Sequence, residues 1–528
     1  MSHTTLAYSF DACYNAMVSR DARFDGSFFT GVNSTGIYCR PVCGVRKPKR
    51  ENCKFYRLPA QAEQAGFRPC LRCRPELAPQ PSNASGPVGG SADLEGRVWS
   101  TQDASCILAR QAAALLDSPE GWGDDGPTMD QLAARLGVSD RHVRRIFEAE
   151  LGVSPLRYLQ TRRLLAAKQW LTDTDLSMSQ VALLSGFNSV RRFNAALAEH
   201  YGLNPSQLRR HQTAVSAAQK KEGILVRAAY RTPYDVAAML GFHSKRALSG
   251  VECYRPEAAG AWFGRTLRLT HHNKVYTGWM WGRFIEARHQ VEMRFSDTLL
   301  GVLPLVCTRL HAMLDLDADA MAINAVLDPL FPSAGGLRVP GSMDGFELAV
   351  RAILGQQITV AAARTITQRL VDQFGEPLQT PHAELNRLFP VAEVMAQVGG
   401  DALGQLGVVK SRQGAIAALA RAVLSEKVQL VPGADAGANI AALKELPGIG
   451  DWTAQYIAMR ALRWPDAFPA GDVALQKALG VAKGKHAAKE AEALSQPFKP
   501  WRSYAVLRAW SSLPGLPSVK TVTPLEPG

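Results

Sequence analysis

The feature that most constrains the fold of this chain is a set of four cysteines near its N-terminus. The spacing is C-x3-C, a gap of 26 residues, then C-x2-C, formed by Cys39, Cys43, Cys70 and Cys73. Two close pairs separated by a loop suit a tetrahedral metal site with four thiolates, most often structural zinc. Arginines flank both pairs. The pattern alone leaves open whether these sulfurs only hold a metal or also react.

The basic charge of the chain is concentrated in two stretches. Residues 1–85 carry twelve Lys/Arg against six Asp/Glu, and residues 126–212 carry twelve against seven. These stretches supply +11 of the net charge of +13. Such a local excess favours a polyanionic partner, nucleic acid first, over a generally basic solubilising surface.

Length and cysteine usage narrow the class of protein. A chain of 528 residues predicts three or more domains. It contains no run of eighteen apolar residues, and its start lacks the basic and apolar regions of a secretory signal, so we expect no membrane contact. Nine cysteines, four of them at metal spacing, favour a reducing compartment, so we expect a cytoplasmic protein.

Composition separates the segments of the chain. Residues 79–125 are typical of a linker, flexible over 79–91 and helical near 101–117, and polar residues 212–222 form a second junction. Beyond it, strand-like runs at 266–270 and 290–295 alternate with loops, and helical periodicity dominates from about residue 306.

Residues 126–212 contain two helix-turn-helix patterns about 49 residues apart. In the first, an apolar-faced helix ends at Gly137 and Ser139 can cap an amphipathic second helix. Gly186 and Ser189 repeat this arrangement. Two copies are stronger evidence than one, because many helical hairpins match the pattern once. The segment resembles the AraC family of transcription activators, which implies binding to promoter DNA and contact with RNA polymerase.

The second helix of each unit carries the side chains that would read DNA. Arginine and asparagine suit bidentate contacts to guanine and adenine edges, although each could equally be a phosphate contact or a solvated charge. The candidates are Arg141, His142, Arg144 and Arg145 in the first unit and Ser189, Arg191, Arg192 and Asn194 in the second.

A tight hairpin followed by a helix marks the C-terminal segment. The hairpin is Leu446-Pro447-Gly448-Ile-Gly450. Its glycines let backbone N–H groups approach a phosphate, and the helix N-terminus favours the anion. The hairpin alone could be a structural turn. Followed about twenty residues later by Asp472 after a glycine, it resembles the helix-hairpin-helix superfamily of DNA glycosylases.

Four stretches within this segment resemble the 3-methyladenine DNA glycosylase II (AlkA) family, and the resemblance covers roughly 224–515. The stretches are Thr232-Pro-Tyr-Asp-Val-Ala-Ala-Met-Leu-Gly-Phe242, Val350-Arg-Ala-Ile-Leu-Gly-Gln356-Gln357, Trp452-Thr-Ala-Gln-Tyr456 and Lys499-Pro-Trp501-Arg-Ser-Tyr504. The resemblance implies hydrolysis of the N-glycosidic bond of alkylated purines. It also implies that Asp472 is the carboxylate that stabilises the oxocarbenium-like sugar and assists a water.

The chemistry sets further expectations for this segment. Alkylation at N3 or N7 makes the purine a cationic, good leaving group, and the base must leave the helical stack to be reached. An electron-rich pocket would hold such a base by stacking and cation–π contacts. The resemblance implies the aromatic residues Phe242, Trp452, Tyr456 and Trp501 for that pocket.

Two positions qualify the resemblance. Relatives that also nick the DNA backbone carry a lysine where this chain has Trp452, so we expect a monofunctional enzyme that leaves an abasic site. Gln357 occupies the position of the residue that fills the gap left by the flipped base, which is leucine in the best-known relative. A monovalent cation at the hairpin is a second cofactor that the resemblance leaves open.

The residues around the four cysteines resemble the N-terminal domain of the Ada methyl sensor over about 10–77. The matching stretches are Gly31-Val-Asn-Ser-Thr-Gly-Ile-Tyr-Cys39-Arg-Pro-Val-Cys43 and Ala65-Gly-Phe-Arg-Pro-Cys70-Leu-Arg-Cys73-Arg-Pro-Glu. The resemblance implies a zinc ion held by all four thiolates, with Cys39 as the irreversible acceptor of a methyl group from a DNA methylphosphotriester. Zinc would keep the nucleophile deprotonated, and methylation would reduce the negative charge that opposes DNA. The alternative is an inert structural zinc site.

We therefore expect an α+β multidomain monomer that acts on double-stranded DNA. The expected parts are a zinc domain (1–78), a linker (79–125), an all-α double helix-turn-helix domain (126–212), an α+β subdomain (223–305) and an all-α helix-hairpin-helix glycosylase core (306–515). The second domain of Ada regulators, with its Pro-Cys-His-Arg signature, has no counterpart here. The competing hypothesis is a regulator whose glycosylase part is an inactive DNA-binding remnant.

Overall fold

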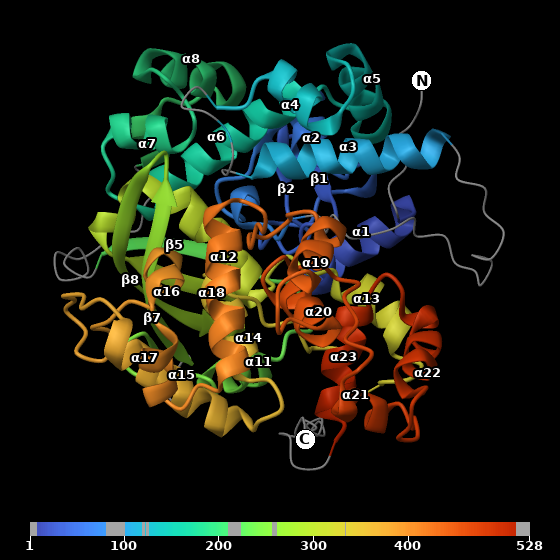
Figure 1. Ribbon diagram of the computed structural model, residues 1–528. Helices are drawn as coiled ribbons and strands as arrows, with labels where there is room; N and C mark the ends of the chain where they lie inside the picture. Colours follow the sequence, from blue (N-terminus) through green and yellow to red (C-terminus); the bar gives the residue numbers. More distant parts are fainter. Residues whose placement is uncertain are drawn as a thin grey trace, which may run out of the picture. The chain divides into compact units, whose positions relative to one another are not determined.

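The computed structural model describes residues 8–80, 101–118, 122, 126–209, 223–255, 261–332 and 334–513 (Figure 1). It divides into two units. The first comprises Met1–Thr232, Thr270–Tyr276 and Ile285–Thr308, and the second comprises Pro233–Leu269, Thr277–Phe284 and Arg309–Gly528. Beyond residue 80, the flexible linker predicted at 79–91 lies outside the described residues, as does the junction at 212–222.

A small four-stranded sheet in the first unit carries the cysteines. Its order is β3-β1-β2-β4, antiparallel except for the parallel pair β2–β4. Its elements are α1 (Phe10–Ser19), β1 (Phe29–Val32), β2 (Ile37–Cys39), β3 (Cys53–Tyr56), α2 (Pro59–Gln64), β4 (Arg68–Pro69) and the 3-10 turns η1 (Ala22–Phe24), η2 (Arg50–Asn52) and η3 (Pro75–Leu77). Because β2 ends on Cys39 and β4 leads directly into Cys70, their parallel pairing brings the two cysteine pairs to one end of the sheet.

The same unit contains both predicted helix-turn-helix units. The helices are α3 (Thr101–Asp117), α4 (Met129–Leu136), α5 (Asp140–Leu151), α6 (Pro155–Asp173), α7 (Met178–Leu184), α8 (Val190–Tyr201) and α9 (Pro205–Arg209). Gly137 ends α4 with φ 65°, and the Ser139 hydroxyl caps α5 by accepting the N–H of His142. Ser189 caps α8 in the same way through Arg192. The predicted helix near 101–117 is α3.

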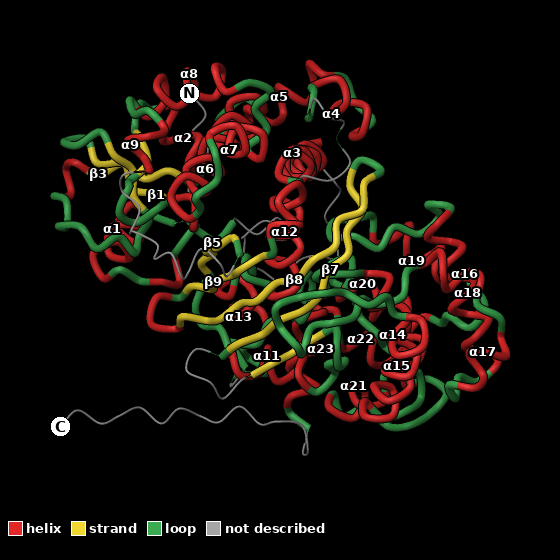
Figure 2. The backbone as a smooth tube through the Cα atoms, turned by 90° about the vertical axis from the view of Figure 1, so that its left-hand side faces the viewer, coloured by secondary structure: helices red, strands yellow, loops and turns green. Residues whose placement is uncertain are grey.

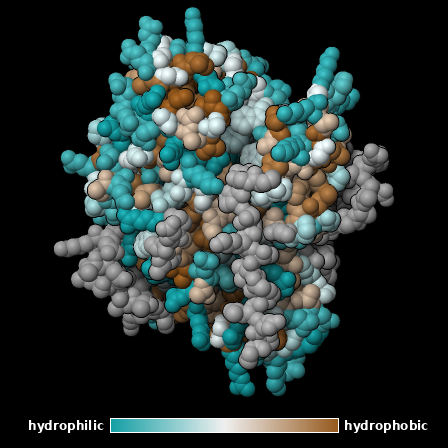
Figure 3. Space-filling model, turned by 90° about the horizontal axis from the view of Figure 1, so that it is seen from below, coloured by the Kyte–Doolittle hydropathy of each residue, from teal (hydrophilic) through white to brown (hydrophobic). Residues whose placement is uncertain are grey.

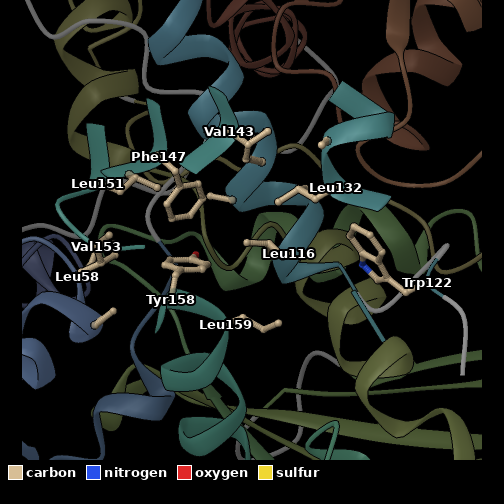
Figure 4. Close-up of a cluster of buried hydrophobic side chains, with 14 residues drawn as sticks. Leu58, Leu116, Trp122, Leu132, Val143, Phe147, Leu151, Val153, Tyr158 and Leu159 are labelled. Carbon is tan, nitrogen blue, oxygen red and sulfur yellow. The ribbon is translucent and has the colours of Figure 1, made fainter. Parts of the chain in front are cut away.

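One hydrophobic cluster joins the first helix-turn-helix to the part of the chain that carries the four cysteines (Figure 4). Phe147 of α5 and Tyr158 of α6 meet edge to face, with ring centroids 5.5 Å apart. Leu58, directly before α2, belongs to the same cluster, and Trp122 packs at its other side. The burial of these large side chains fixes α5 and α6 in place relative to α2.

A second sheet has five strands in the order β5-β9-β8-β7-β6 (Figure 2). The strands are β5 (Ile224–Ala229), β6 (Glu252–Arg255), β7 (Trp262–His271), β8 (Lys274–Ile285) and β9 (Gln290–Phe295). β5 pairs antiparallel with β9, and β6 with β7. The strands predicted at 266–270 and 290–295 therefore lie in β7 and β9.

The remaining elements are almost all helical. They are α11 (Val236–Ser244), η4 (Glu286–Arg288), η5 (Asp297–Val302), α12 (Leu303–Leu314), α13 (Ala320–Leu327), α14 (Gly345–Leu354), α15 (Val360–Phe374), α16 (Ala392–Gln397), α17 (Gly400–Gln405), α18 (Lys410–Leu424), α19 (Ala436–Lys444), α20 (Asp451–Arg460), α21 (Val473–Ala478), α22 (Ala487–Leu494), η6 (Gln496–Phe498) and α23 (Arg502–Ser511). Helix α14 is buried along most of its length and forms the centre of this helical part.

The surface carries few large apolar side chains among the described residues. The most exposed are Leu183, Leu330 and Val473, which come from different parts of the chain. Figure 3 shows hydrophobic patches interspersed with hydrophilic atoms on one face of the molecule. One helical stretch of the described residues, Asp297–Leu314, is long and apolar enough by composition to cross a membrane, and 44% of it is buried inside the protein.

Candidate functional site

A cavity of about 510 Å³ opens among the helices of the second unit. Side chains of α11, α14, α15, α20 and α23 line it, together with residues at the start of α21. Its volume lies in the range typical of small-molecule sites. Four of the predicted functional residues meet there, namely Phe242, Trp452, Tyr456 and Asp472.

Asp472 is fixed at the cavity wall by three hydrogen bonds. As the N-cap of α21, it accepts the N–H of Leu475 on Oδ1 at 2.7 Å. The indole N–H of Trp452 donates to Oδ2 at 2.8 Å, and that of Trp510 donates to Oδ1 at 3.1 Å. Together the three donors hold the carboxylate in a single orientation.

Aromatic rings lead from Asp472 to a group of arginines. The rings of Trp452 and Tyr456 stack with centroids 5.2 Å apart and planes 9° from parallel. Arg460 donates to the Tyr456 hydroxyl at 2.5 Å, and its guanidinium lies over both the Tyr456 ring and the Phe242 ring. Arg246 lies over Phe242 at 3.7 Å from the ring centroid. Two of the rings expected to attract a cationic base, Phe242 and Tyr456, thus already carry guanidinium groups.

The arginines perturb their neighbours. Although burial alone would raise it, the pKa of the Tyr456 phenol is lowered by nearby Arg460 and Arg246. Burial, with Arg460 and Arg351 close by, lowers the pKa of Arg246 to about 10. The cavity is therefore positively charged at this end and negative only around Asp472 among its described lining residues.

The structure corrects one predicted pocket residue. Trp501 does not line the cavity: it is 3% exposed and packs edge to face on Tyr504, directly before α23. Trp510, nine positions further on, lines the cavity and contacts Asp472 instead. Trp501 lies within the matching stretch and Trp510 follows it, and the path of α23 decides which of them reaches the cavity.

The predicted hairpin forms and connects α19 to α20. Gly448 has φ 78°, and a Cβ there would lie 3.1 Å from the Cβ of Ala415, so the turn requires glycine. Apart from the buried Ile449, its residues are exposed or half-exposed. This leaves Leu446, Pro447, Gly448 and Gly450 accessible to a ligand. Nothing in the described residues tests the monovalent cation at the hairpin.

Gln357 lies beside this hairpin in the turn after α14. It is exposed and has φ 55°, a left-handed conformation that is uncommon for residues other than glycine. Its neighbour Gln356, which the sequence analysis did not single out, donates to the carbonyl of Gly448 at 3.0 Å and to the Thr453 hydroxyl at 2.9 Å. Gln356 therefore anchors the turn to the hairpin while Gln357 projects from it.

The candidate DNA-reading residues are accessible on the second helices. Those of α8 are exposed, as are Arg141 and Arg145 of α5. Arg144 pairs with Asp140 at 3.0 Å, and Arg145 contacts the His142 ring at 3.0 Å. The exposed candidates of the second unit are Ser189, which caps α8, and Arg191, Arg192 and Asn194 within α8.

The four cysteines converge at the end of the small sheet. Their Sγ atoms all lie within 4.8 Å of one another. A tetrahedral zinc site with bonds of about 2.3 Å places its sulfurs roughly 3.8 Å apart, so the cluster fits zinc. No disulfide is formed among the described cysteines.

A small hollow of about 20 Å³ opens beside this cluster. Cys39 and Cys43 line it, whereas Cys70 and Cys73 do not. The exposed Arg20 and Lys47 and the buried Arg40 share its wall. Arg40 pairs with the buried carboxylate of Asp25, and its backbone N–H donates to the Cys73 sulfur at 3.3 Å. The hollow thus brings the Cys39 sulfur together with cations suited to a phosphate.

Four family models match successive parts of the chain. Family models match as the metal binding domain of Ada (12–76), a helix-turn-helix domain (132–211), the AlkA N-terminal domain (225–344) and the HhH-GPD superfamily of base excision DNA repair proteins (350–503). The AlkA N-terminal match extends past residue 305, where the α+β subdomain was expected to end. Fold and sites together define a zinc-binding transcription regulator fused to a base-excision DNA glycosylase.

The chain belongs to the family of bifunctional transcriptional activator/DNA repair enzymes. It is 34% identical over 515 residues to the "Probable bifunctional transcriptional activator/DNA repair enzyme AlkA" of Mycobacterium tuberculosis, covering 96% of both chains. It is 32% identical to "DNA-3-methyladenine glycosylase 2" of Escherichia coli over 53% of this chain and 95% of that one. The "Bifunctional transcriptional activator/DNA repair enzyme Ada" of Escherichia coli is 29% identical over 38% of this chain and 49% of that one.

Proposed function

We propose that this chain excises alkylated purines of the 3-methyladenine type from double-stranded DNA, with Asp472 as the catalytic carboxylate. The observation that supports this role is the fixation of Asp472 at the cavity wall by the two indole N–H groups and its helix cap. A carboxylate oriented in this way, in a cavity large enough for a flipped base, suits stabilisation of a cationic sugar. An inactive remnant would have no need to keep this arrangement.

The charge distribution of the cavity fits heterolysis of the glycosidic bond. As the bond from C1′ to the base nitrogen breaks, its electron pair stays with the base and positive charge develops on the sugar. Asp472 would face the sugar, while Arg460 and Arg246 lie beyond the stacked rings where the base gains electron density. Water then adds to C1′, its proton is released, and an abasic site remains.

The test is release of the damaged base from duplex DNA. The wild-type chain should release methylated purines, and Asp472→Asn should be strongly impaired. Absence of release from the wild-type chain would support the remnant hypothesis instead. Borohydride trapping tests the monofunctional assignment, because a lysine that attacked the sugar would form a Schiff base that borohydride traps. Lys245 is the one lysine among the described lining residues. We expect no trapped covalent DNA adduct.

We further propose that Cys39 accepts a methyl group from a DNA methylphosphotriester. Bound zinc would keep the cysteine sulfurs as thiolates at neutral pH. The Cys39 sulfur would attack the methyl carbon, forming an S–C bond while the C–O bond breaks and the phosphodiester leaves with the electron pair. The hollow supports this role, because the buried Cys39 lines it together with Arg20 and Lys47, which would bind the phosphate.

Mass spectrometry after exposure to methylphosphotriester DNA tests this step. One methyl group should appear on the peptide containing Cys39 in the wild-type chain and disappear in Cys39→Ser. Cys53→Ser is the matched control, since Cys53 is buried and outside the cluster. A wild-type chain that binds zinc but gains no methyl group would leave the purely structural alternative.

The helix-turn-helix units complete the proposal. We propose that the candidate residues of α5 and α8 bind promoter DNA, that the activator contacts RNA polymerase, and that the chain acts as a cytoplasmic monomer. The exposure of Arg141, Arg145, Arg191 and Arg192 supports DNA contact. Gel-shift titration of promoter DNA with and without Cys39 methylation, with light scattering for mass, tests these assignments.

A further inference from the structure

A buried ion network lies where three segments of the first unit meet. It consists of Arg74, Glu76, Lys168, Asp173, Arg227 and Glu292, three cations and three anions. Arg74 and Glu76 belong to the zinc-binding part, Lys168 and Asp173 to α6, and Arg227 and Glu292 to the strands β5 and β9. The side chains of Lys168, Asp173 and Glu76 are at most 1% exposed.

Asp173 is the central member of this network. Arg74 donates to its Oδ1 at 2.6 Å, and Arg227 donates to the same oxygen at 3.0 Å. The backbone N–H of Arg227 also donates to Oδ2 at 3.3 Å. One buried carboxylate at the C-terminal end of α6 therefore binds the zinc-binding part and strand β5 together.

The other pairs hold each side of this junction. Glu76 binds Lys168 at 2.5 Å and Arg74 at 2.9 Å. Arg227 binds Glu292 at 3.1 Å, and these two residues are also direct cross-strand partners of β5 and β9. Since buried charges are costly unless all of them are paired, removal of one member leaves its partners uncompensated.

The network begins one residue after a zinc ligand. Arg74 follows Cys73 directly and has φ 56°, so its backbone is held in an uncommon left-handed conformation. Arg40, which follows Cys39, donates to the Cys73 sulfur at 3.3 Å and to the Cys73 carbonyl at 3.1 Å. A displacement of the Cys73 sulfur would therefore reach Arg74 directly along the chain, and a displacement of the Cys39 sulfur would reach it through the contacts of Arg40 with Cys73.

We propose that this network is an internal docking interface through which the zinc site controls the first strand pair of the glycosylase segment. The partner of the zinc-binding part is thus β5 with β9 of the same chain, recognised by complementary buried charge. A second contact supports it: Arg231, just after β5, is 1% exposed and donates to the carbonyls of Asp25 and Gln80 at 2.8 Å. The carboxylate of the same Asp25 pairs with Arg40.

Hydrogen exchange in the full-length, zinc-loaded chain tests this interface. In Asp173→Asn, amides at 224–229 and 290–295 should exchange about tenfold faster than in the wild-type chain, because Arg74 and Arg227 lose the negative charge that they share. Asp117→Asn is the matched control. It removes the charge that faces Arg162 and replaces one of the two oxygens that accept from Arg162 and from the Tyr158 hydroxyl, each at 2.7 Å; both partners are on α6 but outside the network. It should leave exchange in β5 and β9 within about twofold of wild type.

Unchanged exchange in β5 and β9 of a folded Asp173→Asn chain would overturn the proposal, as would equal acceleration in Asp117→Asn. If Asp173→Asn does not fold, a double-mutant cycle of Arg74→Gln and Arg227→Gln tests whether the two arginines act through one shared network. Non-additive effects on exchange in β5 and β9 support a shared network, and additive effects overturn it. Zinc content is measured for each variant, and loss of zinc without faster exchange in these strands also refutes the coupling.

The consequence for repair rests on the proposed function: methylation at Cys39 should change the rate of base release in the wild-type chain and not in Asp173→Asn. The exchange experiment uses no DNA and no methyl transfer. A chain inactive in either reaction can therefore still confirm or refute the interface, so the two failures are distinguishable.

Discussion

Replacement of Asp472 by asparagine removes the negative charge of the site and almost nothing else. The remaining side-chain oxygen can still accept the N–H of Leu475, and asparagine caps helices about as well as aspartate. The new amide N–H₂ group must face one of the two indole N–H groups that donate to Asp472. Loss of that hydrogen bond should lower the free energy of unfolding by about 1 kcal/mol.

The catalytic loss should be much larger. A full charge about 4 Å from a developing cation contributes about 4 kcal/mol at an effective dielectric constant of 20. That energy corresponds to a rate reduction of about a thousandfold. We therefore expect single-turnover release of a methylated purine to slow by about two to three orders of magnitude in Asp472→Asn, with substrate binding little changed.

Asp451→Asn is the matched control for this experiment. Asp451 also lies at a helix N-terminus, but it pairs with Lys444 on the surface and does not line the cavity. Its release rate should stay within about twofold of wild type, because exposed ion pairs contribute little. Release by Asp472→Asn at the rate of Asp451→Asn would show that the carboxylate does not stabilise the transition state.

Three further predictions concern neighbouring sites. Trp510→Phe should slow base release about tenfold by removing one donor to Asp472, whereas Trp501→Phe should lower the melting temperature and leave the release rate unchanged, as excision assays and thermal melts can show. Arg246→Met should lower KM for DNA with cationic purines more than for DNA with neutral lesions, since it removes like charge from the Phe242 face, and equal changes for both would contradict this. Burial raises the pKa of the Glu63 carboxyl to about 7 from its ordinary 4.5. The stability that Glu63 contributes is therefore full below pH 4.5 and is lost as the pH rises to about 7. Glu63→Gln should flatten the dependence of the melting temperature on pH across that window, and an unchanged pH profile would count against this assignment.

The part of the candidate glycosylase site that meets in one cavity could be predicted from the sequence, because the spacing of the residues and the chemistry of their side chains point to the same kind of site. Phe242, Trp452, Tyr456 and Asp472 come from three helices and meet in one cavity, as the resemblance implied. Trp501 was wrong because two tryptophans nine positions apart satisfy the same aromatic requirement, and only the packing of α23 decides which one reaches the cavity.

Some missed residues carried a usable local signal, and others did not. Arg246 and Arg460 each lie four positions after a predicted pocket aromatic. For Tyr456 and Arg460 this spacing places both side chains on one face of α20, whereas Arg246 lies just past the end of α11. The ion network has no such signal. Its central pair, Arg74 and Asp173, is separated by 99 positions, and the partners are defined only when β5 docks against α6.

The arginines also change how the cavity must discriminate between bases. A cationic base gains little from Phe242 and Tyr456, because guanidinium groups already occupy these rings and repel further positive charge. Tighter ground-state binding at these two rings is therefore not a source of preference for alkylated purines. In the proposed mechanism the preference arises in the chemical step, because an alkylated base leaves more readily while the role of Asp472 does not depend on which base departs. Selectivity by leaving-group quality implies a broad substrate range, bounded by the lability of the bond more than by the shape of the cavity.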